Sequence, residues 1–299
     1  MILITLVLAL LAERFLGQYH YLRSYDWFNR YVSAVRARLG ATAFWDGPVG
    51  VIATLAVPLF AVGLMQALLH GVLLSLLGLV FGVVVLLYCL GPRDLDAEAE
   101  AYCAAVEAGD AARAQSSASE LLGYDAPPDP WTRSRVVTDA VLAQCNERLF
   151  AVLFWYALLG PLGAVLFRLA VMLPDSLRPA DAEGAGYIAA ARRLHEILAW
   201  LPARLVALSY ALSGSFEDAM HGWNDYQQEH AEQLVDANSA VLTRTGAGAL
   251  RLDAEGPAPD EQSAEAHVVM VKSALGLMWR TLIIWLGVLL LLSLAGLTR

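Results

Sequence analysis

Five polar residues lie inside or beside apolar segments, where an unpaired charge would be costly. They are Glu147 and Arg148 before an apolar run, Arg168 near its other end, Arg204 in a second apolar run, and Asn238. A guanidinium in such surroundings needs an acid, a carbonyl or a bound anion as its partner. We therefore take these five residues as candidates for an anion-binding site and assign no residue a catalytic role.

Arg204 belongs to the run L-P-A-R-L at 201–205, which opens an apolar segment that ends at Gly214. Pro202 suits the first position of a helix, where its missing N–H is no loss, so we expect a helix over 202–212. Arg204 is expected to pair with Glu147, or with an anion in a cavity near the break at Gly160 and Pro161. The other interpretation is that Arg204 only caps helix carbonyls.

Glu13 and Arg14 directly follow an apolar run over residues 2–12. Ionised groups that face lipid are costly. The two residues therefore mark either the interfacial end of a helix or an ion pair within the membrane.

Other kinds of site are poorly supported. The three cysteines form no C-x-x-C pair and the six histidines show no i,i+4 pairing, so we expect no metal site, disulfide or cofactor. Lys272 follows no glycine-rich turn, which excludes a P-loop. The net charge of -9 argues against binding to nucleic acid.

The elements that position these residues are predicted to be helices in a membrane. The chain is 58% hydrophobic and 16% charged, with a mean hydropathy of +0.53. Residues 47–92 contain no formal charge. This stretch is long enough for two spans, at 48–69 and 72–90. We expect an all-α, polytopic protein of the bacterial inner membrane, with about four transmembrane helices and with helical segments outside the lipid.

The distribution of charged residues predicts how the chain is oriented in the membrane. Four arginines lie among aromatic residues between 19 and 44, which places this loop on the cytoplasmic side and the turn at His70 outside. The apolar segment 149–173 is interrupted by G-P-L-G at 160–163. One crossing fits this segment; if it is re-entrant instead, residues 174–275 return to the cytoplasm.

Six segments are expected in order. They are 1–47, an N-terminal helix with a cytoplasmic loop; 48–91, a transmembrane hairpin; 92–148, a helical cytoplasmic segment; 149–173, a broken membrane helix; 174–275, a polar helical segment that ends in an acidic linker; and 276–299, a C-terminal transmembrane helix.

Within these segments three details are predicted. Residues 94–122 read as two antiparallel helices broken near Gly109, with acids such as Glu98 on a solvated face. Another helix is expected to run from 216 to 241. Gly78 and Gly82 form a G-x-x-x-G that would support a homodimer.

Three stretches resemble a known family. They are the L-P-A-R-L run, residues 1–15 with Glu13 and Arg14, and residues 146–163 from Asn146 to the Gly-Pro break. The chain is similar here to the AmpE family and to its larger relatives, the CobD/CbiB cobinamide-phosphate synthases. The synthases have an N-T-x-D-S run where this chain has A-V-M-L-P-D-S at 170–176, and their P-N-A-G-W-P-E-A run is reduced around Asn238.

The resemblance to AmpE implies an inner-membrane regulator of β-lactamase induction, linked to cell-wall recycling. Its expected partners are membrane lipids and a cell-wall-derived or other anionic small molecule. Because the synthase motifs are reduced, we expect ligand binding without catalysis. The alternatives are an ATP-dependent amide-forming enzyme related to the synthases and a small-solute transporter.

Overall fold

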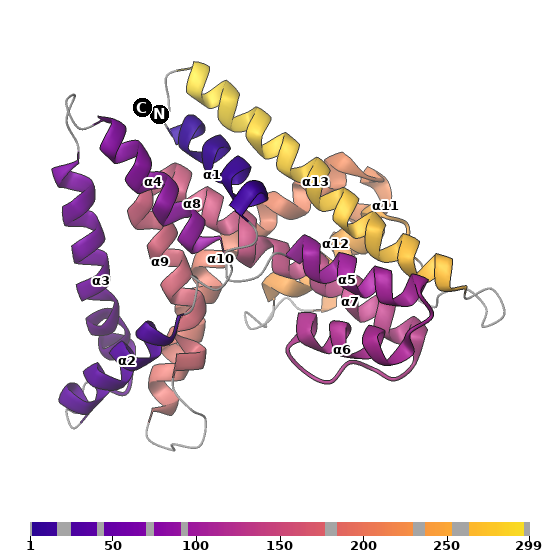
Figure 1. Ribbon diagram of the computed structural model, residues 1–299, viewed down its shortest axis with the longest axis horizontal. Coiled ribbons are helices and arrows are strands. Elements are labelled where there is room, and N and C mark those ends of the chain that lie inside the picture. The colour runs from indigo at the N-terminus through magenta and orange to yellow at the C-terminus, as the bar shows by residue number, and fades with distance from the viewer. Residues whose placement is uncertain are drawn as a thin grey trace. The chain divides into compact units, whose positions relative to one another are not determined.

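The computed structural model describes residues 2–16, 25–40, 45–69, 75–90, 95–176, 184–229, 237–252 and 263–295. All regular structure within these ranges is helical, as the sequence predicts (Figure 1). The chain forms two compact units, and each is built from separated segments. The first unit is Met1–Pro92, Ala151–Ala199 and Leu290–Arg299, and the second is Arg93–Phe150 and Trp200–Leu289.

The first unit contains the predicted hairpin segment. Its elements are α1 (Ile2–Leu16), α2 (Asp26–Leu39), α3 (Pro48–Leu68), α4 (Ser75–Cys89), α8 (Ala151–Leu159), α9 (Pro161–Met172), the short helix η4 (Pro174–Ser176) and the first half of α10 (Ala185–Ser213). Helices α3 and α4 each pack extensively on α9, and α4 also packs on α1. The two predicted spans therefore share α9 as a common support.

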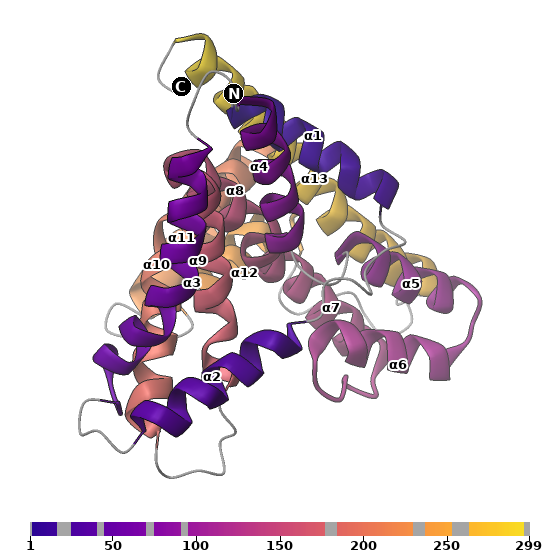
Figure 2. The ribbon, with the colours of Figure 1, turned by 60° about the vertical axis from the view of Figure 1, so that its left-hand side comes forward.

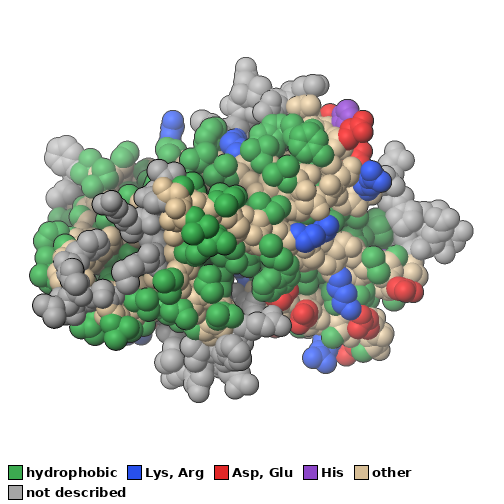
Figure 3. Space-filling view, turned by 90° about the horizontal axis from the view of Figure 1, so that it is seen from above, with side chains coloured by type: hydrophobic (Ala, Val, Ile, Leu, Met, Phe, Trp, Pro, Cys, Tyr) green, Lys and Arg blue, Asp and Glu red, His purple; other side chains and the backbone are tan. Residues whose placement is uncertain are grey.

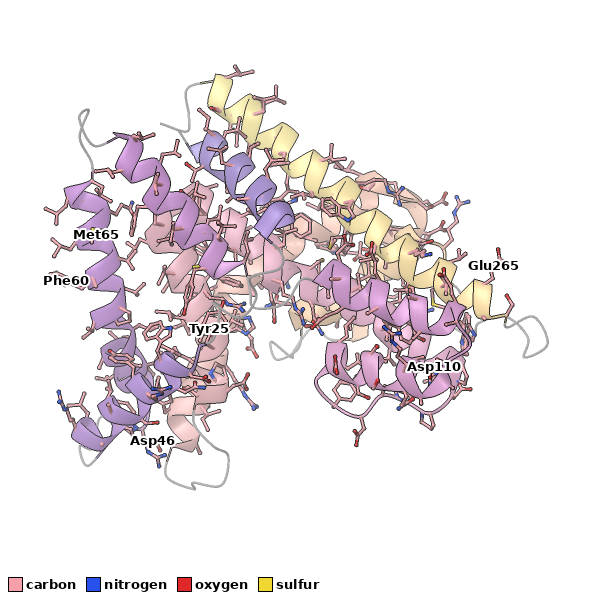
Figure 4. All side chains as sticks on the ribbon, viewed as in Figure 1. Tyr25, Asp46, Phe60, Met65, Asp110 and Glu265 are labelled. Carbon is pink, nitrogen blue, oxygen red and sulfur yellow. The ribbon has the colours of Figure 1, made fainter. Side chains whose placement is uncertain are left out.

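Helix α3 carries an apolar face that no other part of the described chain covers. Ile52, Phe60 and Leu68 are each more than 60% exposed, and Figure 4 shows Phe60 and Met65 pointing outward from the helix. Figure 3 shows hydrophobic side chains gathered over much of the visible surface. Such a face suits contact with lipid tails. Two described helices, α3 and α13 (Ala264–Leu294), are long and apolar enough to cross a membrane.

The segment 149–173 is not one crossing helix. Gly160 ends α8, and the chain reverses there, so that a side chain on Gly163 in α9 would collide with the carbonyl of Trp155 in α8. Helix α9 has 12 residues, or about 18 Å, which is short of the roughly 30 Å of a bilayer core. The structure has a helical hairpin here, which agrees with the re-entrant alternative, and the path through the membrane stays a prediction.

The apex of this hairpin is held by one side chain of α3. The Gln66 Nε2 donates to the carbonyl of Leu159 at 3.3 Å, and its Oε1 accepts from the backbone N–H of Leu162 at 3.1 Å. The Leu159 carbonyl lies at the end of α8 and the Leu162 N–H at the start of α9. Backbone groups at these helix ends have no partner within their own helix. Gln66 thus satisfies the backbone that the reversal opens.

At its other end, α9 leads back to the start of α3. Leu169 and Leu173 share an apolar cluster with Val51 and Leu55 of α3 and with Tyr187 of α10. Helix α2 completes this cluster with Phe28 and Val32, and it lies across the ends of its neighbours in Figure 2.

Helix α10 is anchored in the same cluster. Its Tyr187 is fully buried and stacks on Trp45 with ring centroids 5.1 Å apart. The Tyr187 hydroxyl donates to Thr54 Oγ1 at 3.2 Å, and its backbone N–H donates to Asp46 Oδ1 at 2.8 Å. Asp46 therefore caps the first turn of α10 from a distant part of the chain, which favours the positive end of the helix dipole.

Pro202 lies in the interior of α10, so the prediction that a helix begins there is wrong. A proline in a helix leaves the carbonyl four residues earlier without its usual donor. That carbonyl belongs to Leu198, and it accepts from the Trp155 indole Nε1 at 3.0 Å. This substitute donor lets one helix of 29 residues continue through the proline.

The second unit begins with the predicted antiparallel pair. Helices α5 (Leu95–Glu107) and α6 (Ala111–Leu122) pack on each other and on α7 (Pro130–Cys145). Asp110 caps α6 through the N–H of Arg113, and Asp129 caps α7 through that of Thr132. The short π-helix η3 (Asn146–Phe150) follows α7 directly.

The expected helix over 216–241 is instead two helices packed side by side, α11 (Phe216–Glu229) and α12 (Ala237–Ala249). A side chain on Gly222 would collide with the carbonyl of Arg244, and one on Gly248 with that of Asp218. Each glycine thus allows backbone to approach backbone, and together they favour the pair over a single long helix.

Candidate functional site

The structure brings together two of the predicted site residues, Arg204 and Asn238, within the second unit. The Arg204 Nη1 donates to Asn238 Oδ1 at 2.9 Å and to the carbonyl of Trp200 at 3.1 Å. Its guanidinium also lies 4.3 Å from the centroid of a Trp200 ring. The carbonyl contact agrees with the capping interpretation, and the amide contact adds a partner from α12.

Arg148 has a partner that the sequence did not suggest. Its Nη1 lies 2.7 Å from Glu98 Oε2, and the Glu98 side chain is only 14% exposed. The expectation that Glu98 belongs to a solvated face is wrong for this residue, because α5 packs against α7 and brings the carboxylate to Arg148. A partly buried pair of this kind fixes both side chains.

Glu147 and Arg148 both lie in the π-helix η3, beside a buried amide. Asn146 is 1% exposed, and its Oδ1 has no hydrogen-bond partner in the described residues. π-Helices are rare and concentrate at functional sites, and a buried unpaired acceptor calls for a donor such as a ligand or an ordered water. The segment over 146–150 is therefore a candidate for part of a functional site in this unit. The run N-E-R before an apolar segment was its signal in the sequence.

The cysteines of the second unit are unsuited to nucleophilic chemistry. Burial raises the pKa of the Cys145 thiol to about 12 and that of Cys103 to about 11. Both therefore stay protonated at neutral pH, whereas the thiolate is the reactive form. Cys145 lies 2.7 Å from the hydroxyl of Tyr210, which donates to the carbonyl of Leu142 and ties α10 to α7.

Arg168 belongs to the first unit and lines a cavity of about 240 Å³. The residue is 7% exposed. Its Nε donates to the Tyr25 hydroxyl at 3.1 Å, and its guanidinium lies 4.9 Å from the Tyr25 ring centroid. Helices α3, α4 and α9 supply most of the cavity wall, and Tyr25 with Trp27 closes one side.

Some predictions about sites stay open. Glu13 and Arg14 lie in α1, but their side chains are outside the described part, and so is His70. Gly82 faces Tyr156 and Thr5 of the same chain, so its side of α4 is already occupied. The homodimer stays a prediction. Within the described ranges no three metal-binding side chains form a group.

Comparison with known proteins identifies the family. A family model described as CobD/Cbib protein matches residues 6–277. The cobalamin biosynthesis protein CobD of Chromobacterium violaceum is 31% identical over 259 residues, which cover 85% of this chain and 81% of the relative. That of Stutzerimonas stutzeri is 32% identical over 235 residues, covering 73% and 75%, and that of Pelobacter propionicus is 30% identical over 138 residues, covering 45% and 42%. No solved structure is significantly similar.

These relatives overturn the interpretation as a non-catalytic regulator of β-lactamase induction. That interpretation gave decisive weight to the reduced synthase motifs around residues 170–176 and Asn238. The similarity to proteins named for cobalamin biosynthesis extends over most of the chain, and the range that the family model matches includes both stretches. The chain belongs to the CobD/CbiB family.

Proposed function

We propose that this protein is an ATP-dependent amide-forming enzyme of cobalamin biosynthesis, of the cobinamide-phosphate synthase type. The observation that carries the proposal is the family match over residues 6–277. The relatives that cover most of their own length in the alignment bear the name cobalamin biosynthesis protein CobD.

The proposed reaction joins a corrinoid carboxylic acid to an amine. A carboxylate is a poor acyl donor because its oxygen leaves badly. Attack of that oxygen on the terminal phosphorus of ATP releases ADP and makes the oxygen part of a phosphate. The amine nitrogen then forms the C–N bond, phosphate leaves with the C–O electron pair, and the nitrogen loses a proton.

The second unit offers groups suited to the phosphates of such a reaction. Arg148 is oriented by Glu98, and Arg204 is oriented by Asn238 and by the ring of Trp200. Arginine held by neighbouring groups is pre-organised for phosphate, since its planar fork matches two oxygens at once.

Complementation tests this proposal. We expect the chain to restore cobalamin-dependent growth to a bacterium that lacks its own synthase, and the purified protein to form the amide in the presence of ATP. Production of the amide is measured by mass spectrometry. A chain that is present in the membrane but gives neither growth nor product would contradict the proposal.

Two arginines of α10 supply a matched pair of variants for the same assay. Arg204→Gln keeps much of the side-chain length but removes the charge, and we expect product formation to fall about 10- to 100-fold, the effect of losing one charged hydrogen bond to substrate. Arg192 is exposed on the same helix, so Arg192→Gln is expected to remain active. Equal activity of the two variants would remove Arg204 from the site.

The finer topology is also a proposal. We infer a multi-pass protein of the inner membrane in which α3 and α4 cross, α8 and α9 enter and return, and the chain after α9 emerges on the cytoplasmic side. The support lies in the first unit, where the start of α10 is bonded to Asp46 just before α3. Asp46 follows the arginine-rich segment that is predicted to be cytoplasmic.

Single cysteines distinguish the two paths of the 149–173 segment. In sealed cells we expect cysteines at positions 33 and 176 to be protected from an impermeant reagent and a cysteine at position 70 to react. Disruption of the membrane should expose the first two, which controls for burial. Reaction of position 176 in sealed cells, with position 33 protected, would restore the single crossing.

A further inference from the structure

The second half of α10 carries leucines on its outer face. Leu201, Leu205, Leu208 and Leu212 follow one another at spacings of three or four residues, so they lie on one side of the helix. Their exposed fractions are 43%, 36%, 44% and 68%. We call these four residues the leucine stripe. Soluble proteins rarely leave a continuous apolar surface without a partner that covers it.

The inner face of the same helical segment holds small residues. Ala203, Ala207 and Ala211 are each fully buried against the rest of the unit. Contacts between helices inside a membrane favour such residues, because they let the backbones approach closely, whereas lipid tails are as apolar as leucine. With alanines inside and leucines outside, the outer face of this segment suits lipid better than it suits water or another helix.

Charge is also absent from this face. No charged residue lies between Leu205 and Phe216. Arg204 precedes this stretch, and its guanidinium donates to Asn238 of α12 and to the carbonyl of Trp200. The charge next to the leucine stripe therefore has partners within the second unit, which lowers the cost of placing it near lipid.

The second half of α10 also lies beside the apolar part of α13. The Arg280 Nη1 donates to the carbonyl of Ser213 at 2.8 Å, and the Trp285 Nε1 donates to Ser209 Oγ at 3.1 Å. A later residue of α13 thus meets an earlier residue of α10, so the two helices run antiparallel here. Residues 281–298 carry no charge, and α13 is long and apolar enough to cross a membrane. The chain of α10 before Ser213 therefore runs alongside the uncharged part of α13.

The outward side chains of α13 continue the same apolar surface. Ile283 and Val288 are 68% and 50% exposed. We propose that the leucine stripe of α10 lies against the acyl chains of membrane lipids, at the depth of the part of α13 that follows Arg280. The inference rests on the proposed membrane location and deepens it, because it gives the predicted polar segment 174–275 a lipid contact of its own.

Spin labels on single cysteines test the proposal in the full chain, in nanodiscs of phosphatidylethanolamine and phosphatidylglycerol. Oxygen concentrates among acyl chains and a nickel chelate stays in water, so the relaxation of the label reports which of the two surrounds it. We expect oxygen to have the larger effect at Leu208→Cys and Leu212→Cys, as at Val288→Cys. The ratio should invert at Ser116→Cys, which is exposed on α6 of the same unit. The native cysteines are buried, so the unsubstituted chain gives the background.

The outcomes at positions 208, 212 and 288 separate the proposal from the membrane location on which it rests. A larger nickel effect at 208 and 212, with a larger oxygen effect at 288, would overturn the proposal and leave α13 in the membrane. A larger nickel effect at all three positions would overturn both. Protection of 208 and 212 from both reagents would overturn the proposal too, because a protein surface such as a second copy would then cover the leucine stripe.

Aspartate substitutions give an independent measurement. Leu208→Asp places an ionised carboxylate against acyl chains, which is costly, so we expect a lower midpoint of thermal unfolding in the same nanodiscs. Ser116→Asp is the matched control, since each position lies about a turn and a half before the end of its helix, and its midpoint should stay close to the parent. Equal midpoints of the two variants would overturn the lipid contact.

Discussion

Replacing Tyr187 with alanine is expected to lower the free energy of unfolding of the first unit by about 3 to 5 kcal/mol, the range for truncating a buried aromatic side chain. The ring is fully buried against Trp45 and lies in the cluster that joins α3, α9 and α10. Its loss leaves a cavity where three helices meet. The shift is measured as a lower midpoint of thermal unfolding in detergent, and the variant should also fail in complementation.

Tyr187→Phe is the matched control. It keeps the stacking on Trp45 and removes only the hydrogen bond to Thr54, so we expect a loss of about 1 kcal/mol. The bond from Asp46 goes to the backbone and survives in both variants. If alanine and phenylalanine had the same small effect, the start of α10 would not be anchored on α3.

Local patterns in the sequence predicted several elements well. The uncharged stretch predicts a span over 48–69, and α3 covers Pro48–Leu68. The break near Gly109 was also predicted correctly, because Asp110 caps the helix that follows it. Such elements depend on hydrophobicity and caps within a few residues, which a single sequence shows directly.

The failures share a different physical cause. Whether α10 continues through Pro202 depends on the Trp155 indole, and whether the chain reverses at Gly160 depends on Gln66. Trp155 and Gln66 both lie far in the sequence from the backbone groups that they satisfy. A proline or a Gly-Pro pair shows only that the backbone is interrupted locally, and not which distant side chain satisfies the freed groups.

The candidate site residues were likewise predicted only in part from the sequence. Arg148, Arg168 and Arg204 were found because charge in an apolar segment is visible in the sequence. Of their partners only Asn238 was among the candidate site residues, since Glu98 was predicted to lie on a solvated face and Tyr25 was one of several aromatic residues in its segment. Pairing is a tertiary property, so the candidates could be predicted but most of their contacts could not.

The second large effect on stability is expected from replacing Gly160, where the chain reverses between α8 and α9. Gly160 has φ 68° and ψ -153°, a conformation that is essentially restricted to glycine, and a Cβ there would lie 3.0 Å from the Gln66 Nε2. Gly160→Ala should therefore cost about 1 to 3 kcal/mol in backbone strain. Displacing Gln66 adds the loss of its hydrogen bonds to Leu159 and Leu162, about 0.5 to 1.5 kcal/mol for each bond, since neither bond is fully buried.

Two further variants separate the backbone strain at position 160 from the loss of the Gln66 hydrogen bonds. Gln66→Leu keeps the glycine but removes both hydrogen bonds, so it should lower the midpoint of thermal unfolding in detergent by less than Gly160→Ala. Gly276 lies in α13 where an added Cβ meets nothing within 4 Å, so Gly276→Ala is expected to be neutral or to stabilise by up to about 1 kcal/mol. A Gly160→Ala protein as stable as Gly276→Ala would mean that the backbone at 160 is an ordinary helix. In that case α8 and α9 would form one continuous span, and the inferred return of the chain to the cytoplasmic side would fail with it.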